Sequence, residues 1–256
     1  MKTKIALLSL GLVSLGFSLD EYMPIAPKTL ELDGGYSPIF GTGGYDSTGT
    51  KGSLPSGVSP MTHNVPLQFK YAIMSGLDAE LAFTFSSQNT DAGGASGFKQ
   101  PDIALKYALP NMPFAAFLDV TLPFATGDYD VSGIPTGIAV GGVSGKTFDK
   151  IQATAKVLYQ YNLKTSGVKP QDLFDVYLKP GYTISDALGA YLGIDYNMNT
   201  DGDATTSPYL VSVMPGVTYT QNKMLAYEVN IPVTVAGQSN GASWGVWASV
   251  YVTLGM

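Results

Sequence analysis

Long segments of this chain alternate apolar and mixed side chains with a period of two, and this pattern restricts the fold more than any other feature. In 112–124, Leu118 and Leu122 fall on one face while Asp119 and Thr121 fall on the other. Successive side chains of a β-strand point to opposite faces, so each segment predicts a strand with one apolar face. Eleven segments show the pattern clearly: 29–36, 64–74, 77–86, 99–109, 112–124, 148–163, 172–184, 187–198, 208–220, 224–236 and 243–255.

Most of these segments are ten to thirteen residues long. That exceeds the usual strand length of about 5–6 residues and suits a membrane-spanning strand of about 9–11. The connections alternate between tight turns, at 75–76, 110–111, 185–186 and 221–223, and long loops rich in small polar residues. The expected long loops are 37–63, 87–98, 125–133, 164–171, 199–207 and 237–242.

Short turns at one end and long loops at the other are typical of outer-membrane barrels. Eleven strands would break this alternation, so a Gly-rich twelfth strand is expected over 134–143, with its turn at 144–146. The prediction is an all-β protein, a transmembrane antiparallel up-and-down β-barrel of about 12 strands. Seven prolines oppose this reading, because proline cannot donate to a β-ladder. They are Pro66, Pro101, Pro113, Pro123, Pro180, Pro215 and Pro232.

The N-terminus reads as a targeting segment. Lys2 and Lys4 precede an uncharged, leucine-rich stretch, and the small residues Gly16 and Ser18 suit cleavage after residue 18. We therefore expect a signal peptide over 1–18 and a single barrel domain over 19–256. The expected location is the outer membrane of a Gram-negative bacterium. Outer-membrane lipid and the barrel assembly machinery are the expected partners there.

Composition excludes several kinds of function. The chain has no cysteine and one histidine, His63, so neither a disulfide nor a two-histidine metal site can form within it. All 14 basic residues are lysine and the net charge is −6, which excludes nucleic acid as a partner. His63 lies in no nucleophile motif, and the Asp pairs at 128/130 and 201/203 complete no calcium loop. We expect neither an enzyme nor a cofactor.

The mixed face of the strands carries repeated charge, whereas aromatic residues of the apolar face gather near both strand ends. Aromatic rings prefer the two membrane–water interfaces, so the apolar face is expected to point outward into lipid. By this register nine acids and four lysines face the lumen. The acids include Glu31 and Asp33. The other expected lumen-facing candidates are Lys70, Asp78, Glu80, Asp102, Lys106, Asp119, Lys156, Asp175, Tyr177, Lys179, Tyr191, Asp195, Glu228, Trp247 and Tyr251.

Four short motifs resemble a known family from about residue 60 to the C-terminus. They are 65–71 (VPLQFKY), leading into 76–81 (GLDAEL), then 101–107 (PDIALKY) and 122–128 (LPFATGD). In order and spacing they are similar to outer-membrane proteins named for the MetA pathway of phenol degradation. The resemblance implies a barrel and transport of small solutes, aromatic ones among them.

Three hypotheses follow from the sequence. The first is an outer-membrane channel or transporter for small neutral, cationic, aromatic or hydrophobic solutes. The second is a non-conducting structural or adhesive barrel whose lumen is blocked by charge pairs such as Lys70 with Glu80. The third is a secreted soluble barrel whose apolar face lines an internal cavity.

Overall fold

The structure is a computed structural model that describes residues 25–54, 61–90, 93–129, 136–163, 170–200 and 207–255. The expected signal peptide at 1–18 lies outside these residues. The strands are β1 (Thr29–Tyr45), β2 (Lys51–Gly52), β3 (Met61–Met74), β4 (Leu77–Thr90), β5 (Gly93–Phe98), β6 (Asp102–Ala108), β7 (Phe114–Thr121), β8 (Gly137–Phe148), β9 (Ile151–Asn162), β10 (Asp172–Thr183), β11 (Leu188–Thr200), β12 (Tyr209–Asn222), β13 (Leu225–Asn230), β14 (Val233–Gln238), β15 (Asn240–Gly245) and β16 (Trp247–Gly255). A single short 3₁₀ turn, η1 (Gly127–Tyr129), accompanies them within the described chain, and no helix of that part is long and apolar enough to cross a membrane.

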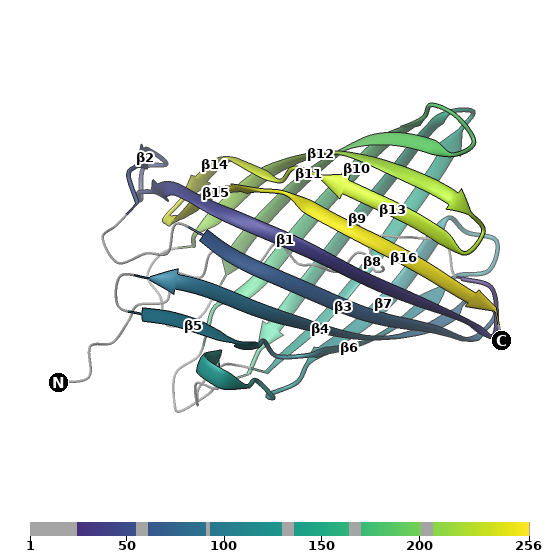
Figure 1. The fold of residues 1–256 in the computed structure, drawn as a ribbon, viewed down its shortest axis with the longest axis horizontal. Helices are drawn as coiled ribbons and strands as arrows, with labels where there is room; N and C mark the ends of the chain where they lie inside the picture. Colours follow the sequence, from purple (N-terminus) through teal and green to yellow (C-terminus); the bar gives the residue numbers. More distant parts are fainter. Residues whose placement is uncertain are drawn as a thin grey trace.

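The strands form one closed antiparallel barrel (Figure 1). The sheet runs from β1 through β3, β4, β6 and each following strand to β12, and β15 and β16 pair back onto β1. Three wall strands are interrupted, and each is described as two pieces: β5 with β6, β13 with β14, and β15 with β16. Counted this way, the described residues form a barrel of 12 strands. The predicted fold class is confirmed.

The two ends of the barrel differ as expected, with some corrections to the boundaries. β1 continues to Tyr45 because its second half pairs with β3 and β15, so residues 37–45 of the predicted loop 37–63 are strand. The predicted loop 237–242 is instead a tight turn at Ser239, which adopts a positive φ of 51°. The twelfth strand exists as β8, but it runs to Phe148, and its turn lies at Asp149 and Lys150 rather than at 144–146.

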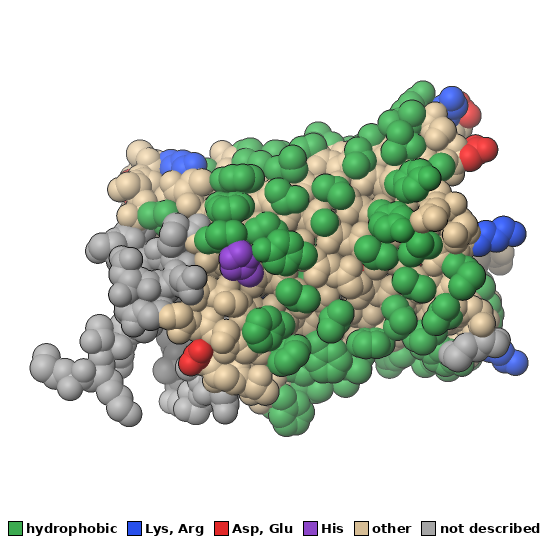
Figure 2. All heavy atoms as spheres, viewed as in Figure 1, with side chains coloured by type: hydrophobic (Ala, Val, Ile, Leu, Met, Phe, Trp, Pro, Cys, Tyr) green, Lys and Arg blue, Asp and Glu red, His purple; other side chains and the backbone are tan. Residues whose placement is uncertain are grey.

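The outer surface of the barrel is apolar. Along β3, Val65, Leu67 and Phe69 are exposed, whereas the alternating Gln68 and Lys70 are buried. Hydrophobic side chains cover the middle of the molecule in Figure 2, and most of the coloured charged side chains lie near its two ends. A soluble barrel would point this apolar face inward, so the hypothesis of a secreted barrel with an apolar cavity is wrong. The fold and this surface place the protein in the outer membrane of a Gram-negative bacterium, as predicted.

Aromatic side chains of the outer face pair near both ends of the strands. Phe40 stacks on Trp244 with a centroid distance of 4.6 Å near the long-loop end. Tyr219 and Tyr227 stack at 6.3 Å near the short-turn end, on β12 and β13. Such rings anchor a barrel at the two membrane–water interfaces.

The prolines occupy places where the β-ladder is already interrupted. Pro215 and Pro232 lie where the pairs of β12 skip from Val213↔Val233 to Gly216↔Asn230. Pro180 lies where the β10–β11 pairs skip from Leu178↔Ile194 to Gly181↔Tyr191. Pro66 faces a similar skip between β1 and β3, Pro101 separates β5 from β6, and Pro113 and Pro123 lie outside β7.

These interruptions adjoin one another around part of the wall. The proline carbonyls still accept hydrogen bonds there: Pro215 from the N–H of Ile231 at 3.0 Å, Pro232 from Gly245 at 2.9 Å and Pro38 from Val246 at 3.1 Å. We call the set Pro38, Pro66, Pro101, Pro180, Pro215 and Pro232 the proline seam. Five of the seven predicted prolines belong to this seam, where the ladder skips, and Pro113 and Pro123 lie outside β7, so all seven are compatible with a closed barrel.

Candidate lumen site

The strand alternation brings the predicted lumen residues to the inner face of the wall. Along β10, for example, the buried Asp175 and Tyr177 and the half-buried Lys179 share one face, whereas Leu178 on the other face is exposed. The buried members are Lys70, Asp78, Glu80, Lys106, Lys156, Asp175, Tyr177, Asp195, Glu228 and Trp247. The half-buried members are Asp102, Asp119, Lys179, Tyr191 and Tyr251.

One part of the inner face, on β1, β3, β4 and β6, holds two ion pairs. The ammonium of Lys70 lies 3.3 Å from Oε1 of Glu31, its direct neighbour across the strand pair. Glu80, on the other side of Lys70, accepts a hydrogen bond from the amide of Gln68. Lys106 lies 3.8 Å from Asp78 in the same register. Buried charges of this kind are costly unless they are paired.

A second group surrounds Lys156 on β9. Its ammonium lies 3.9 Å from Oδ1 of Asp175 and 5.6 Å from the ring centroid of Tyr177. Both of these residues come from β10, which pairs with β9 so that Tyr177 faces Lys156 directly. Asp175 is fully buried, yet neither of its carboxylate oxygens accepts a hydrogen bond.

A third group, which we call the Glu228 cluster, joins four strands nearer the short-turn end. The carboxylate of Glu228 accepts hydrogen bonds from the hydroxyls of Tyr191 and Tyr251, the latter at 3.1 Å. Asn230 donates to the same carboxylate at 3.5 Å, and Lys179 lies 3.7 Å away. The Lys179 ammonium also lies 4.2 Å from the ring centroid of Tyr191. Asn230 was not among the residues predicted to face the lumen, because an asparagine in a strand does not by itself indicate a functional site.

Part of the inner face is apolar. Ala104, Phe117, Ala139 and Leu158, on β6 to β9, form one buried hydrophobic cluster that we call the apolar facet. The ring of Phe117 lies over Gly141 of the next strand, where a Cβ atom would overlap it. In the strand order, β7 and β8 lie across the barrel from β13 and β16, which carry Glu228 and Tyr251. Charged residues also lie beside the apolar facet, since Asp119 on β7 pairs with Ala104 and Ala139, and Lys106 and Lys156 lie on β6 and β9. The inner face therefore carries an apolar facet set among charged groups.

Other candidate groups lie away from the lumen. His63 is on the outer face, where its Nδ1 lies 2.6 Å from the hydroxyl of Tyr36. Within the described residues no three His, Asp or Glu side chains converge to hold a metal ion. Asp128 accepts from the backbone N–H of Ser96 at 2.8 Å, while positions 130, 201 and 203 lie outside the described residues.

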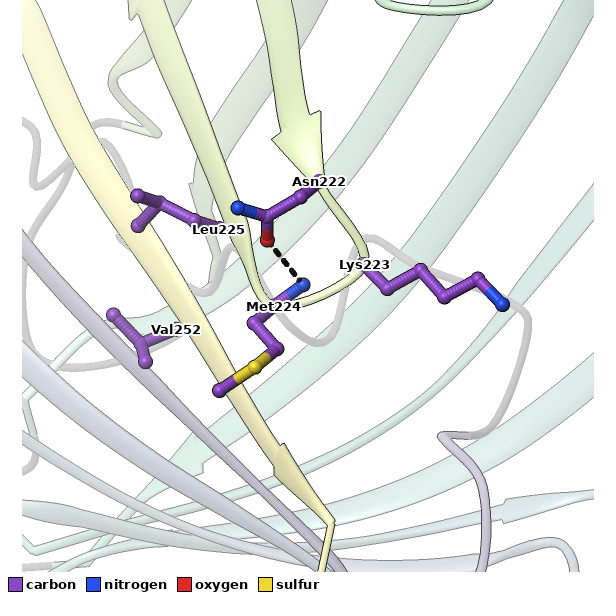
Figure 3. Close-up of a pocket in the computed structure, with 5 residues that line it drawn as sticks. All are labelled: Asn222, Lys223, Met224, Leu225 and Val252. Carbon is purple, nitrogen blue, oxygen red and sulfur yellow. Dashed lines mark hydrogen bonds between the residues drawn. The ribbon is translucent and has the colours of Figure 1, made fainter.

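A shallow apolar pocket lies on the outside of the wall at the β12–β13 turn (Figure 3). Met224 and Val252 point to the same side of it, whereas Lys223 points away. The turn is fixed by a hydrogen bond of 2.8 Å from the N–H of Met224 to Oδ1 of Asn222. Because Leu225 and Val252 belong to the outward-facing set, this pocket is separate from the lumen site.

Comparison with solved structures identifies the same architecture. An outer-membrane channel from Pseudomonas putida F1 matches with a TM-score of 0.74 and 12% identity, over 91% of this chain and 98% of that one. The translocator domain of the autotransporter NalP from Neisseria meningitidis matches with a TM-score of 0.56 and 8% identity, over 92% of both chains. The CymD monoaromatic hydrocarbon channel matches with a TM-score of 0.51 and 10% identity, over 90% of this chain and 89% of that one.

These likenesses show that the chain has the fold of an outer-membrane β-barrel. Because the matching barrels include channels and an autotransporter domain, the shared fold by itself does not decide the function. No protein-family model and no curated protein matches the chain. The resemblance to the family named for the MetA pathway therefore stays a prediction.

Proposed function

We propose that this protein is an outer-membrane channel for small solutes, and that aromatic and hydrophobic molecules bearing a polar group are its finer substrate class. The observation that carries the proposal is the inner face, where the apolar facet lies among charged groups. A solute with an apolar body and a polar group can contact both kinds of surface at once. The lumen-facing set predicted from the sequence would line this path.

The comparisons support the general class of function. Two of the barrels with similar folds are outer-membrane channels, and one of them is described as a channel for monoaromatic hydrocarbons. At 12% identity or less, the likeness shows a shared fold, and the channel function of those two proteins supports the proposal for this chain. The outer-membrane partners expected from the sequence, lipid and the assembly machinery, are part of the same proposal.

The experiment is solute flux into proteoliposomes, with the full chain refolded and checked by heat-modifiable gel mobility. Phenylalanine and serine make suitable probes, since they share a zwitterionic backbone and differ in the apolar side chain. We expect both to enter, and phenylalanine to be favoured. Leu158→Asn should reduce that preference, because it places an amide on the apolar facet. Met214→Gln, a buried inner-face change on β12 away from that facet, should preserve it.

A non-conducting structural barrel is the competing function, and the burial of paired inner lysines favours it. Lys70 and Lys106 are 1% and 3% exposed, although both face the inside of the barrel. If refolded protein passes neither solute and shows no conductance in planar bilayers, the channel proposal is overturned and the structural role stands.

A further inference from the structure

We propose that the lumen carries two binding stations for alkylammonium groups, one formed by Asp175 and Tyr177 and the other by Glu228 and Tyr191. The transported solutes would then include small organic amines with an apolar body. This inference rests on the proposed channel function and specifies its substrate class.

Each station already holds an alkylammonium group, the head of a lysine. Lys156 lies 3.9 Å from Asp175 and 5.6 Å from the centroid of Tyr177, and Lys179 lies 3.7 Å from Glu228 and 4.2 Å from the centroid of Tyr191. A carboxylate beside an aromatic face is the combination that recognises ammonium ions, since the charge and the ring quadrupole both attract the cation. The same arrangement occurs twice, on different strands.

Neither lysine lies at full hydrogen-bonding distance from its carboxylate, and at Asp175 no other donor replaces it. Both ammonium–carboxylate distances exceed the 2.7–2.9 Å typical of a charge-assisted hydrogen bond. Neither oxygen of the fully buried Asp175 accepts a hydrogen bond, and Oδ1 of Asn197, its direct partner on β11, has no donor either. A buried carboxylate without hydrogen bonds is unfavourable, so a second cation that donates to it is stabilised.

The charge of the inner face favours the same ligand. Nine acids and four lysines make up its predicted charged set, and each of the four lysines has a carboxylate within 3.3–3.9 Å. The remaining negative charge attracts cations and repels anions along the whole lumen.

The stations are placed so that an amine could use the apolar facet as well. Asp175 pairs directly with Leu158, a member of that facet, so an ammonium at Asp175 leaves the apolar part of the solute near Leu158 and Phe117. Asp175 and Lys179 are four residues apart on β10, which is about 13 Å along a strand. The first station lies nearer the long loops and the second nearer the short turns. A solute crossing the barrel would therefore reach them one after the other.

The test is the reversal potential of the full chain in planar bilayers under a gradient of methylammonium chloride, whose cation has three N–H donors. We expect the wild type to favour the cation. Asp175→Asn and Glu228→Gln should each lower the cation-to-chloride permeability ratio, by about tenfold for the loss of an interaction worth 1.4 kcal/mol. Asp186→Asn is the matched control, because it removes the same charge from an exposed turn.

The aromatic half of the station is tested separately. Tyr177→Phe keeps the ring and should retain the selectivity, whereas Tyr177→Leu should lower it about two- to fivefold, the equivalent of a cation–π contact. Heat-modifiable gel mobility shows which variants are folded. If Asp175→Asn does not fold, the selectivity of Tyr177→Leu tests whether the first station exists.

The outcomes separate this inference from the channel function. If the wild type passes neutral solutes but is unselective or anion-selective, or if folded Asp175→Asn and Tyr177→Leu both match the wild type, the stations are refuted and the channel stands. If the wild type passes neither ions nor neutral solutes, the channel proposal fails, and the stations fail with it.

Discussion

The Glu228 cluster shows how one buried carboxylate can be held by several weak contacts from different strands. Tyr251→Phe removes only the hydroxyl that donates to Oε2 of Glu228 at 3.1 Å. Because the carboxylate is buried, the loss should lower the free energy of unfolding by about 1–3 kcal/mol. Urea unfolding followed by gel mobility measures the change. Tyr219→Phe, on the lipid-facing side, is the control, and an equal loss there would contradict the assignment.

Asp46 organises the turn that follows β1. Hydrogen bonds from the hydroxyl of Thr48 and from the backbone N–H groups of Thr50 and Thr48 hold its pKa below the ordinary value of 3.8. A lowered pKa means that the ionised form stabilises the turn at pH values above the unfolded pKa. That contribution should be lost as the pH falls through the lower folded pKa.

An NMR titration of the Asp46 side-chain carboxyl measures this directly. We expect a midpoint below 3.8, and Thr48→Ala should move it upward because the hydroxyl donor with the largest effect on the pKa is removed. A midpoint at or above the ordinary value in the wild type would show that the turn is not held in this way.

At the scale of single residues, alternation alone predicts which charged side chains lie on the inner face. It could not give the contacts. Lys70 has two acidic neighbours across its strand pairs, Glu31 and Glu80, and its position in the sequence does not reveal which of them it approaches to 3.3 Å. Such choices depend on side-chain rotamers and on competing partners such as Gln68.

At the scale of elements, β8 illustrates why a Gly-rich strand was the hardest to predict. Its inner positions carry small residues because the neighbouring strand supplies the bulk: the ring of Phe117 fills the space over Gly141. An alternating pattern of apolar side chains does not reveal a strand in which glycine backbone, rather than side chains, contacts the neighbouring residues. The strand's turn was also placed too early, because nothing in the sequence distinguishes Ser144–Lys146 from Asp149–Lys150.

Gly141→Ala should therefore destabilise the barrel. The added Cβ would overlap both the ring of Phe117 and the carbonyl oxygen of Val157, so the strands must shift. We expect a loss of about 1–3 kcal/mol in the free energy of unfolding, as for other overpacked sites. Gly34→Ala is the matched control, since its Cβ would make only an ordinary contact of 3.5 Å with Leu67. Equal effects of the two changes would rule out this packing.

The proline seam predicts a local difference in amide exchange. Around Pro215 the ladder skips between Val213 and Gly216, whereas β8 and β9 pair continuously from Gly137 to Phe148 and contain no proline. Amides of β12 to β14 beside the skip should therefore exchange faster than those of β8 and β9. Hydrogen–deuterium exchange with mass spectrometry in detergent compares them. Uniform protection along the two pairs of strands would show that the skip has no effect on local stability.

At the scale of the whole molecule, the number of strands was predicted from the requirement that it be even. Tight turns and long loops can alternate around a closed barrel only if the number of strands is even, and this required a twelfth strand that its own sequence barely indicated. The ends of strands were less predictable, because residues 37–45 form strand through pairing with β3 and β15, which lie far from them in the sequence. Closure of the barrel depends on all strands together and cannot be predicted from any single segment.

The cost of placing a lysine on the outer face should depend on the depth of the residue in the membrane more than on its solvent exposure. Leu67 and Ile73 both lie on the outer face of β3 and are almost equally exposed, at 43% and 47%. Leu67 is near the middle of the strand and Ile73 is one residue from its short-turn end. Leu67→Lys should cost about 2–4 kcal/mol, as at a bilayer midplane, and Ile73→Lys about 0–1 kcal/mol, as near an interface. Reversible unfolding in lipid vesicles measures both. In a soluble barrel, two surface lysines of equal exposure would have equal and small effects, so equal costs would mean that the apolar outer face does not contact lipid.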